Sequence, residues 1–217
     1  MIKTQLNSFE TLPVTEASEK IGLFGGSFNP PHEGHVLVAE TALACLALDQ
    51  IWWMVTPGNP LKKEVSLLPL KERVAQSLEI VQDARIHVTA FEEAIKSHFF
   101  LQSLKYIKQQ RQGHFVLIIG ADNLKNFHLW KGWQEIVHTL PIAVVDRPFV
   151  NQQLQNCPFI EKFKNFSIKE KEAASLAYQQ APVWCYIHGA LSFQSSTAIR
   201  QSLSLIHISE PTRLRRI

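Results

Sequence analysis

Short apolar runs alternate with segments of helical spacing along the chain. The apolar runs are rich in β-branched and aromatic residues, which is typical of buried strands, and they lie at Ile21–Phe24, Ile51–Val55, Ile86–Val88, Phe115–Ile119, Ile142–Val145 and Val183–Ile187. Helices are predicted between them at Gly34–Leu48, Leu70–Val81, His98–Gln110, Trp130–His138 and Lys169–Gln179. This alternation indicates an α/β fold. We expect a single domain with a Rossmann-like, doubly wound parallel sheet of five to six strands and helices on both faces.

Residues suited to ligand binding follow several of these strands directly. In an open parallel sheet, ligands bind beyond the carboxyl ends of the strands, where the strand order reverses. The loops concerned are Gly25–His35, Thr56–Lys63, Gly120–Asn123 and Asp146–Pro148. The sequence therefore predicts one composite site at this edge of the sheet.

Composition excludes several classes of protein. Of the 217 residues, 46% are hydrophobic and 19% charged, as in ordinary globular domains. No apolar run has the roughly 20 residues of a membrane helix, and the first twenty residues contain no apolar signal-peptide core. Three cysteines without C-x-x-C spacing indicate neither a disulfide framework nor a zinc site. We expect a cytoplasmic protein without membrane contact.

Net charge also argues against nucleic acid as a partner. The formal charge is +3, of which +2 lies in the last fifteen residues, leaving +1 for residues 1–202. A charge of +1 is too small to indicate a nucleic-acid-binding surface. The segment 203–217 also differs in character from the rest, and its first eleven residues are similar to a translated transposon-end sequencing adapter. We therefore divide the chain into a polar N-terminal extension (1–20), a domain (21–202) and a non-native, adapter-like tail (203–217).

The loop after the first strand, GGSFNPPHEGH, is suited to anions. Its glycines let the backbone approach a phosphate closely, and a helix N-terminus follows. Neither a G-x-G-x-x-G dinucleotide fingerprint nor a Walker A motif is present. His32 and His35 are three residues apart, so their rings can reach one ligand from the same helix face. Metal ligation is the competing use, but no third ligand has a compatible spacing.

Two motifs together resemble those of a known family. GGSFNPPHEGH resembles the G-x-F-x-P-x-H-x-G-H signature of the nucleotidyltransferases related to class I aminoacyl-tRNA synthetases, and SSTAIR (Ser195–Arg200) resembles their S-S-T-x-x-R signature. Within that superfamily, four intervening segments are similar to bacterial nicotinate-nucleotide adenylyltransferases: VTPGNPLK, IGADNL, FHLWKGWQEI and PIAVVDRP. The resemblance covers residues 20–202.

The resemblance implies a reaction and a set of site residues. ATP and nicotinate mononucleotide would give nicotinate adenine dinucleotide and pyrophosphate in NAD biosynthesis, by in-line attack on the α-phosphorus without a covalent intermediate and with Mg²⁺ accompanying ATP. The implied catalytic residues are His32, His35 and Arg200. Those implied for ATP binding are Gly25, Gly26, Ser27, Phe28, Asp122, Ser196 and Thr197. Those for the mononucleotide are Asn59, Lys62, Asn123, Trp130 and Arg147, with Trp130 stacked on the nicotinate and Trp133 left to packing.

One segment departs from the family pattern, and two rival functions stay open. Where relatives show a helix start similar to Y-T-x-D-T-L, this chain has FFLQSL (Phe99–Leu104), so no site residue is inferred there. The first rival is the same chemistry on another phosphorylated acceptor, such as pantetheine phosphate. The second is a degenerate protein that binds nucleotide without turnover.

Overall fold

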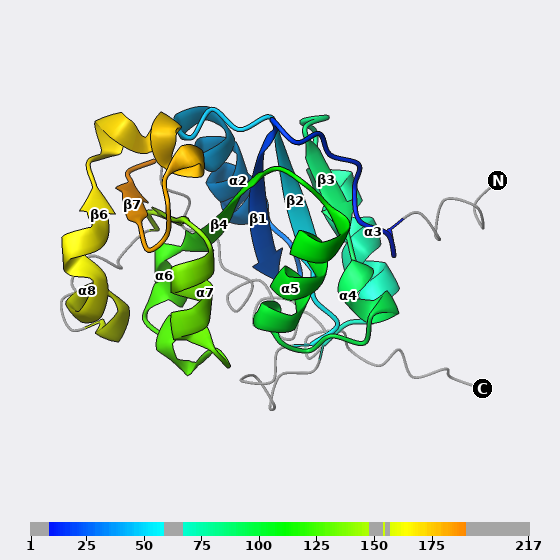
Figure 1. The fold of residues 1–217 in the computed structure, drawn as a ribbon. Helices are drawn as coiled ribbons and strands as arrows, with labels where there is room; N and C mark the ends of the chain where they lie inside the picture. The colour runs from blue at the N-terminus through cyan, green and yellow to red at the C-terminus, as the bar shows by residue number, and fades with distance from the viewer. Residues whose placement is uncertain (1–8, 59–66, 148–153, 155–156, 190–217) are drawn as a thin grey trace, which may run out of the picture.

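A parallel β-sheet forms the centre of the molecule (Figure 1). The structure is a computed structural model that describes residues 9–58, 67–147, 154 and 157–189. Its strands are β1 (Lys20–Gly26), β2 (Gln50–Val55), β3 (Ile86–Thr89), β4 (His114–Gly120), β5 (Ile142–Val145), β6 (Ser167–Ile168) and β7 (Trp184–Ile187). They are ordered β3-β2-β1-β4-β5-β7-β6, and all neighbours are parallel.

The α/β class and the six predicted strands are confirmed, but the predicted count of five to six strands is wrong. The seventh strand, β6, pairs only Ser167 and Ile168 with β7 at the sheet edge. Two residues are too few to show an apolar or alternating pattern. The strand order reverses between β1 and β4, which are adjacent although two strands separate them in sequence. The loops after these two strands therefore flank the crevice expected in such a sheet.

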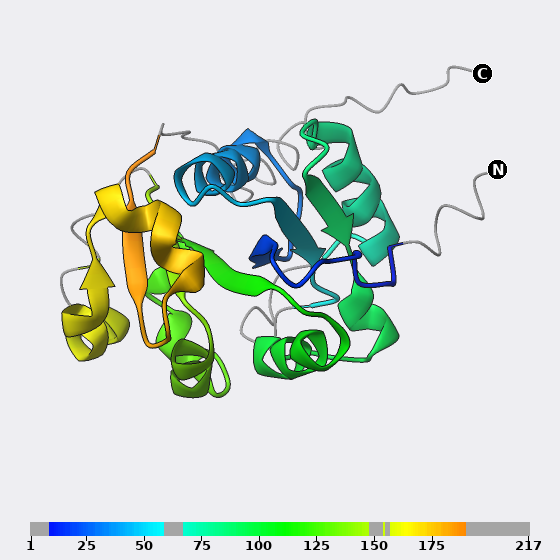
Figure 2. The same cartoon turned by 45° about the horizontal axis from the view of Figure 1, so that its top comes forward.

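Helices cover both faces of the sheet, and the second view separates the two layers (Figure 2). One face packs against α2 (Glu33–Cys45), α3 (Leu70–Ile80) and the 3₁₀ segment η4 (Glu170–Tyr178). The other packs against α4 (Phe91–Ala94), α5 (Phe100–Gln110), α7 (Trp133–Thr139) and α8 (Pro158–Phe163). Within β4, Phe115 and Leu117 face one core while Val116 and Ile118 face the other. This period of two fills both cores with one strand.

The predicted helices occur close to their expected positions. Ala47 adopts a left-handed conformation with φ 49°, so α2 ends before Leu48. The segment predicted at 169–179 is helical, but it winds as the 3₁₀ segment η4 rather than as an α-helix. Short elements that the pattern did not predict include α4, α6 (Ala121–Leu124), η1 (Phe127–Leu129), α8 and η3 (Lys164–Phe166).

The described part of the N-terminal extension lies against the domain. Thr89 Oγ1 donates to the carbonyls of Phe9 and Thr11, and Arg111 donates to those of Leu12 and Pro13. The Leu12 side chain is buried in the core on the α5 side. The adapter-like tail lies outside the described residues. No helix in the described part has the length and apolar character to cross a bilayer.

Candidate active site

Two histidine rings meet at the start of α2. The chain leaves β1 at Gly26, passes Pro30 and Pro31, and enters the helix from His32, whose φ of −155° is extended. The His35 N–H donates to His32 O at 2.8 Å, which closes the first turn. The ring centroids of the two histidines lie 3.8 Å apart. The two rings thus lie side by side at the start of α2, close enough to contact the same ligand.

The surroundings of His32 favour its neutral form. Its side chain is only 5% exposed, and burial, together with the positive charge of Arg147, lowers its pKa to about 4. Its Nδ1 atom is buried and has no hydrogen-bond partner in the part of the chain that the structure describes. A buried ring nitrogen without a partner is costly unless a ligand completes it. This atom is therefore suited to a substrate contact.

Arg147 lies directly beside the histidines. It follows β5, its side chain is 10% exposed, and its Nη1 donates to Gly34 O at 2.7 Å. Its Nε lies 3.8 Å from Asp122 Oδ1, after β4. A Cβ atom at Gly34 would collide with Arg147 Nη1 and lie 3.0 Å from the His32 ring. Only glycine lets α2 approach the guanidinium this closely.

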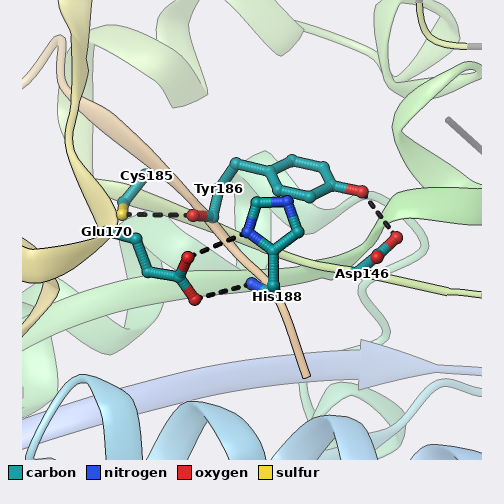
Figure 3. A network of polar contacts seen from close by, with 5 residues as sticks. All are labelled: Asp146, Glu170, Cys185, Tyr186 and His188. Carbon is teal, nitrogen blue, oxygen red and sulfur yellow. Dashed lines mark hydrogen bonds and ion pairs between the residues drawn. The ribbon is translucent and has the colours of Figure 1, made fainter. Parts of the chain in front are cut away.

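A network of polar contacts joins Asp146, the residue before Arg147, to Tyr186 on β7 (Figure 3). Asp146 Oδ1 accepts from the Arg147 N–H at 2.7 Å and from the Tyr186 hydroxyl at 2.6 Å. Burial and this hydrogen bond raise the pKa of Tyr186 well above its usual value. Beside it, His188 Nδ1 lies 2.8 Å from Glu170 Oε2, and the His188 N–H donates to Glu170 Oε1 at 2.8 Å. The β5 and β7 ends are thus tied together next to the site.

The Phe28 ring packs between the rings of His35 and Trp53. The Phe28 ring stacks on Trp53 at 4.3 Å and meets the His35 ring edge-on at 5.0 Å. Its backbone is left-handed, with φ 43°. A Cβ atom at Gly26 would lie 3.0 Å from the Phe28 ring, whereas one at Gly25 would meet no described atom within 4 Å. The space beside Gly25, which holds no described atom, fits a ligand against the backbone.

The structure therefore brings Phe28, His32, His35, Asp122 and Arg147 together beyond β1, β4 and β5. Asn123 is exposed on α6. Trp130 is partly buried, and its ring contacts those of Phe127 at 5.2 Å and Phe100 at 5.8 Å. Trp133 packs on Phe127 and Phe163.

Five predicted site residues lie outside the described residues, namely Asn59, Lys62, Ser196, Thr197 and Arg200. The sequence analysis missed Tyr186 and Arg73, and it placed Gly34 and Asp146 in site loops without giving either a role. The contacts of Tyr186 with Asp146, of Arg73 with Ser27 and of Gly34 with Arg147 join positions far apart in the chain, so the local pattern does not indicate them. In the described ranges, no group of three or more histidine, cysteine or carboxylate side chains is arranged to hold a metal ion.

In the segment that departs from the family pattern, Ser103 has a structural partner. Its hydroxyl donates to Glu92 Oε1 at 2.5 Å and lies 3.0 Å from Ser97 Oγ. All three side chains are buried, and burial raises the pKa of Glu92 to about 7. Ser103 is thus engaged in the core.

The chain is similar to proteins of one family over most of its length. Residues 23–202 match the family model described as cytidylyltransferase-like. A probable nicotinate-nucleotide adenylyltransferase of Rhizobium meliloti (strain 1021) is 52% identical over 185 residues, which cover 85% of this chain and 98% of the relative. That of Mesorhizobium japonicum is 49% identical, with coverages of 88% and 98%.

A solved structure shares the fold. Nicotinic acid mononucleotide adenylyltransferase of Plasmodium falciparum, complexed with NaAD, superposes with a TM-score of 0.60 at 17% identity, covering 84% of this chain and 83% of that one. The family model over residues 23–202 and the identity to the two relatives establish that the chain belongs to the nicotinate-nucleotide adenylyltransferases of the cytidylyltransferase-like family.

Proposed function

We propose that this chain transfers the adenylyl group of ATP to nicotinate mononucleotide, giving nicotinate adenine dinucleotide and pyrophosphate. The observation that carries the proposal is the convergence of His32, His35 and Arg147 beyond β1 and β5. Two imidazoles and a guanidinium offer hydrogen-bond donors to phosphate oxygens from one side. ATP is at hand in the cytoplasm, where we expect the reaction to occur.

The reaction needs alignment more than proton transfer. A phosphate oxygen of the mononucleotide attacks the α-phosphorus of ATP, and the bond from that phosphorus to the bridging oxygen of pyrophosphate breaks. The attacking phosphate is largely dianionic at pH 7, because its second pKa is about 6. No general base is required. The protein must instead bring two anions together and stabilise the charge that develops on the transferred group.

We assign the contact at the α-phosphate to His35, with His32 beside it. Without substrate, burial and the charge of Arg147 hold the pKa of His32 at about 4, so its ring enters the reaction as a neutral hydrogen-bonding group. Preorganised donors of this kind stabilise charge that appears in the transition state. Gly25, Gly26, Ser27 and Phe28 would contribute main-chain contacts, and Asp122 would contact the adenosine part. We also propose that Arg200, Ser196 and Thr197 bind the outer phosphates.

For the acceptor, we propose that Trp130 stacks on the pyridine ring. Its partly buried ring is braced by Phe100 and Phe127, which supports a rigid stacking surface. Asn59, Lys62 and Asn123 are proposed to contact the mononucleotide. The Arg147 guanidinium is directed at Gly34 O, so we propose that it aids the phosphates electrostatically while holding α2.

We propose that Mg²⁺ enters with the phosphates of ATP. The described residues form no three-ligand cage, and Mg²⁺ in such enzymes is held mainly by substrate phosphates, water and one or two carboxylates. Asp122, whose carboxylate lies 3.8 Å from Arg147 Nε, is an alternative candidate to hold a metal-bound water instead of contacting the adenosine. When bound, the ion supplies charge neutralisation on the phosphates.

The test is pyrophosphate release from ATP and Mg²⁺ with nicotinate mononucleotide, nicotinamide mononucleotide and phosphopantetheine in parallel. Turnover with nicotinate mononucleotide and identification of the dinucleotide product are expected. Turnover with phosphopantetheine instead would assign another acceptor. The same assay is run on a folded version whose residues 203–217 are replaced by the ending of the Rhizobium meliloti relative. If neither protein releases pyrophosphate with any of the three acceptors, the enzymatic function is rejected.

A further inference from the structure

A single buried arginine ties together the loops that follow β1 and β2. Arg73 lies in the first turn of α3 and is 1% exposed. Its Nη1 donates to Ser27 O at 2.6 Å and to Thr56 O at 2.8 Å, its Nη2 to Pro57 O at 3.2 Å and its Nε to Leu68 O at 2.9 Å. One planar group thus fixes three separate stretches of backbone.

The residue type calls for an explanation beyond packing. Within the described ranges, the Arg73 guanidinium forms no ion pair with a carboxylate, and carbonyl oxygens alone surround its donors. Burying a charge costs several kcal/mol, and apolar residues of similar volume are often as stabilising in such places. Stability alone therefore does not explain why an arginine is buried at position 73. The geometry that its guanidinium imposes on the carbonyl partners does.

That geometry sets the direction of two backbone amides. The Ser27–Phe28 and Pro57–Gly58 peptide bonds are trans, since the cis bonds of the described chain are at Pro30 and Pro182. In a planar trans peptide the C=O and N–H groups point in opposite directions. Because the carbonyls of Ser27 and Pro57 point at Arg73, the N–H groups of Phe28 and Gly58 point away from it. Neither N–H donates to an acceptor in the part of the chain that the structure describes.

Phe28 is held in this orientation from several sides. Its φ of 43° is the left-handed conformation, which is strained for a residue with a side chain. The stacked Trp53 ring holds the side chain, and Arg73 holds the preceding carbonyl. The Leu68 N–H also donates to Asn29 Oδ1 at 3.0 Å, a second link between the same loops. A strained backbone that the surroundings fix in this way is a common feature of functional sites.

We propose that Arg73 is a positioning residue of the nucleotide site: by gripping the Ser27 and Pro57 carbonyls, it turns the amides of Phe28 and Gly58 outward to receive the phosphates of ATP. The inference rests on the proposed function and deepens it. Arg73 itself does not touch the substrate. Oriented amides of this kind bind phosphate without reorganising during the reaction.

The test compares Arg73→Lys and Arg73→Met with a control, Arg85→Met. Arg85 is an exposed arginine bonded to Asp83, away from these loops. A lysine has three donors and no fork, so it cannot reach all four carbonyls. The kcat/KM for ATP is expected to fall by about a hundredfold in Arg73→Met, as for a misplaced reacting group, and by about tenfold in Arg73→Lys. The KM for ATP should rise more than the KM for nicotinate mononucleotide, whose proposed contacts Asn59 and Lys62 follow the same loop.

A purely structural role would give a different pattern. It would lower the midpoint of thermal unfolding while kcat and both KM values, measured well below that midpoint, stay at their original values. That result in folded Arg73→Lys overturns the proposal. If Arg73→Met does not fold, the lysine variant alone decides. The Arg85→Met control should leave all kinetic constants unchanged.

Binding of ATP separates this proposal from the proposed function. A ligand that binds only the folded state raises the unfolding midpoint. We expect ATP with Mg²⁺ to raise the midpoint of the unchanged protein and to raise that of Arg73→Lys much less, whichever acceptor is used. If no acceptor gives turnover but ATP still raises the midpoint of the unchanged protein more than that of Arg73→Lys, the proposed function is overturned and the role of Arg73 stands. If both proteins turn over nicotinate mononucleotide at the same rate, the proposed function stands and the role of Arg73 is overturned.

A measurement on the unchanged protein needs no variant. Amide exchange followed by NMR should slow at Phe28 and Gly58 when ATP and Mg²⁺ are added. Unaltered exchange at both amides while other amides of the site respond would overturn the proposed orientation.

Discussion

Replacing Gly25 by alanine separates ligand binding from folding. In the structure, a Cβ atom at Gly25 meets no described atom within 4 Å, and its backbone is not left-handed. The unfolded chain loses entropy on gaining a Cβ, so the free energy of unfolding should stay the same or rise by up to about 1 kcal/mol. With ATP bound, however, the methyl group would occupy the space that we assign to a phosphate.

The magnitude follows from the cost of an extra methyl group at a packed contact. Such overpacking costs about 1–3 kcal/mol, which corresponds to a rise of about 5- to 150-fold in the KM for ATP if KM reports binding. The assay is initial-rate kinetics with ATP varied at saturating nicotinate mononucleotide, next to thermal unfolding of the free protein. An unchanged KM for ATP in the folded variant would refute the placement of ATP at Gly25.

Gly22→Ala is the matched control in the same strand. There the added Cβ would lie 2.5 Å from Ile118 Cδ1 and 2.8 Å from Leu48 Cδ1, inside the core. This variant should lose about 1–3 kcal/mol of stability and, below its unfolding midpoint, keep its KM for ATP. The two glycines should thus behave in opposite ways.

Three further substitutions test other parts of the account. His35→Ala should lower turnover at least about a hundredfold, as for loss of one transition-state donor, while the protein stays folded; near-normal turnover would remove His35 from its role. Trp130→Ala should raise the KM for nicotinate mononucleotide more than the KM for ATP, whereas equal effects would indicate packing on Phe127 alone. Glu92→Gln should change the dependence of stability on pH. Burial raises the Glu92 pKa from 4.5 to about 7, so the folded state binds an additional proton between these values and loses stability as pH rises through them. Thermal unfolding should therefore find the variant more stable than the original protein at pH 8, by up to about 3 kcal/mol, and similar at pH 4.5; an equal difference at both pH values would argue against a protonated Glu92.

The strands were predictable because parallel strands buried on both faces are continuous apolar runs. The six runs found in the sequence are six of the strands, and only the two-residue β6 carries too little pattern. The pairing of His32 and His35 was also predictable, because the two residues are only three positions apart at the start of α2. A contact between residues this close in sequence does not depend on the order of the strands.

The supporting residues were not predictable for the opposite reason. Arg73 is a charged residue in an amphipathic helix, which usually indicates a solvated face, yet it is buried and donates to carbonyls of the loops after β1 and β2 and to Leu68 just before its own helix. Arg147 is likewise turned inward by Gly34, 113 residues earlier in the chain. Such contacts depend on the order of strands in the sheet. The sequence pattern specifies which residues form strands, but it does not specify which loops become neighbours.

The central claim is a single in-line displacement at the α-phosphorus, and its stereochemistry tests that claim most directly. The reaction is run with nicotinate mononucleotide and one diastereomer of adenosine 5′-O-(1-thiotriphosphate), and the configuration of the thiophosphate in the dinucleotide is determined by ³¹P NMR. One in-line attack predicts inversion at phosphorus. Retention would require two displacements through an adenylylated residue and would contradict the account.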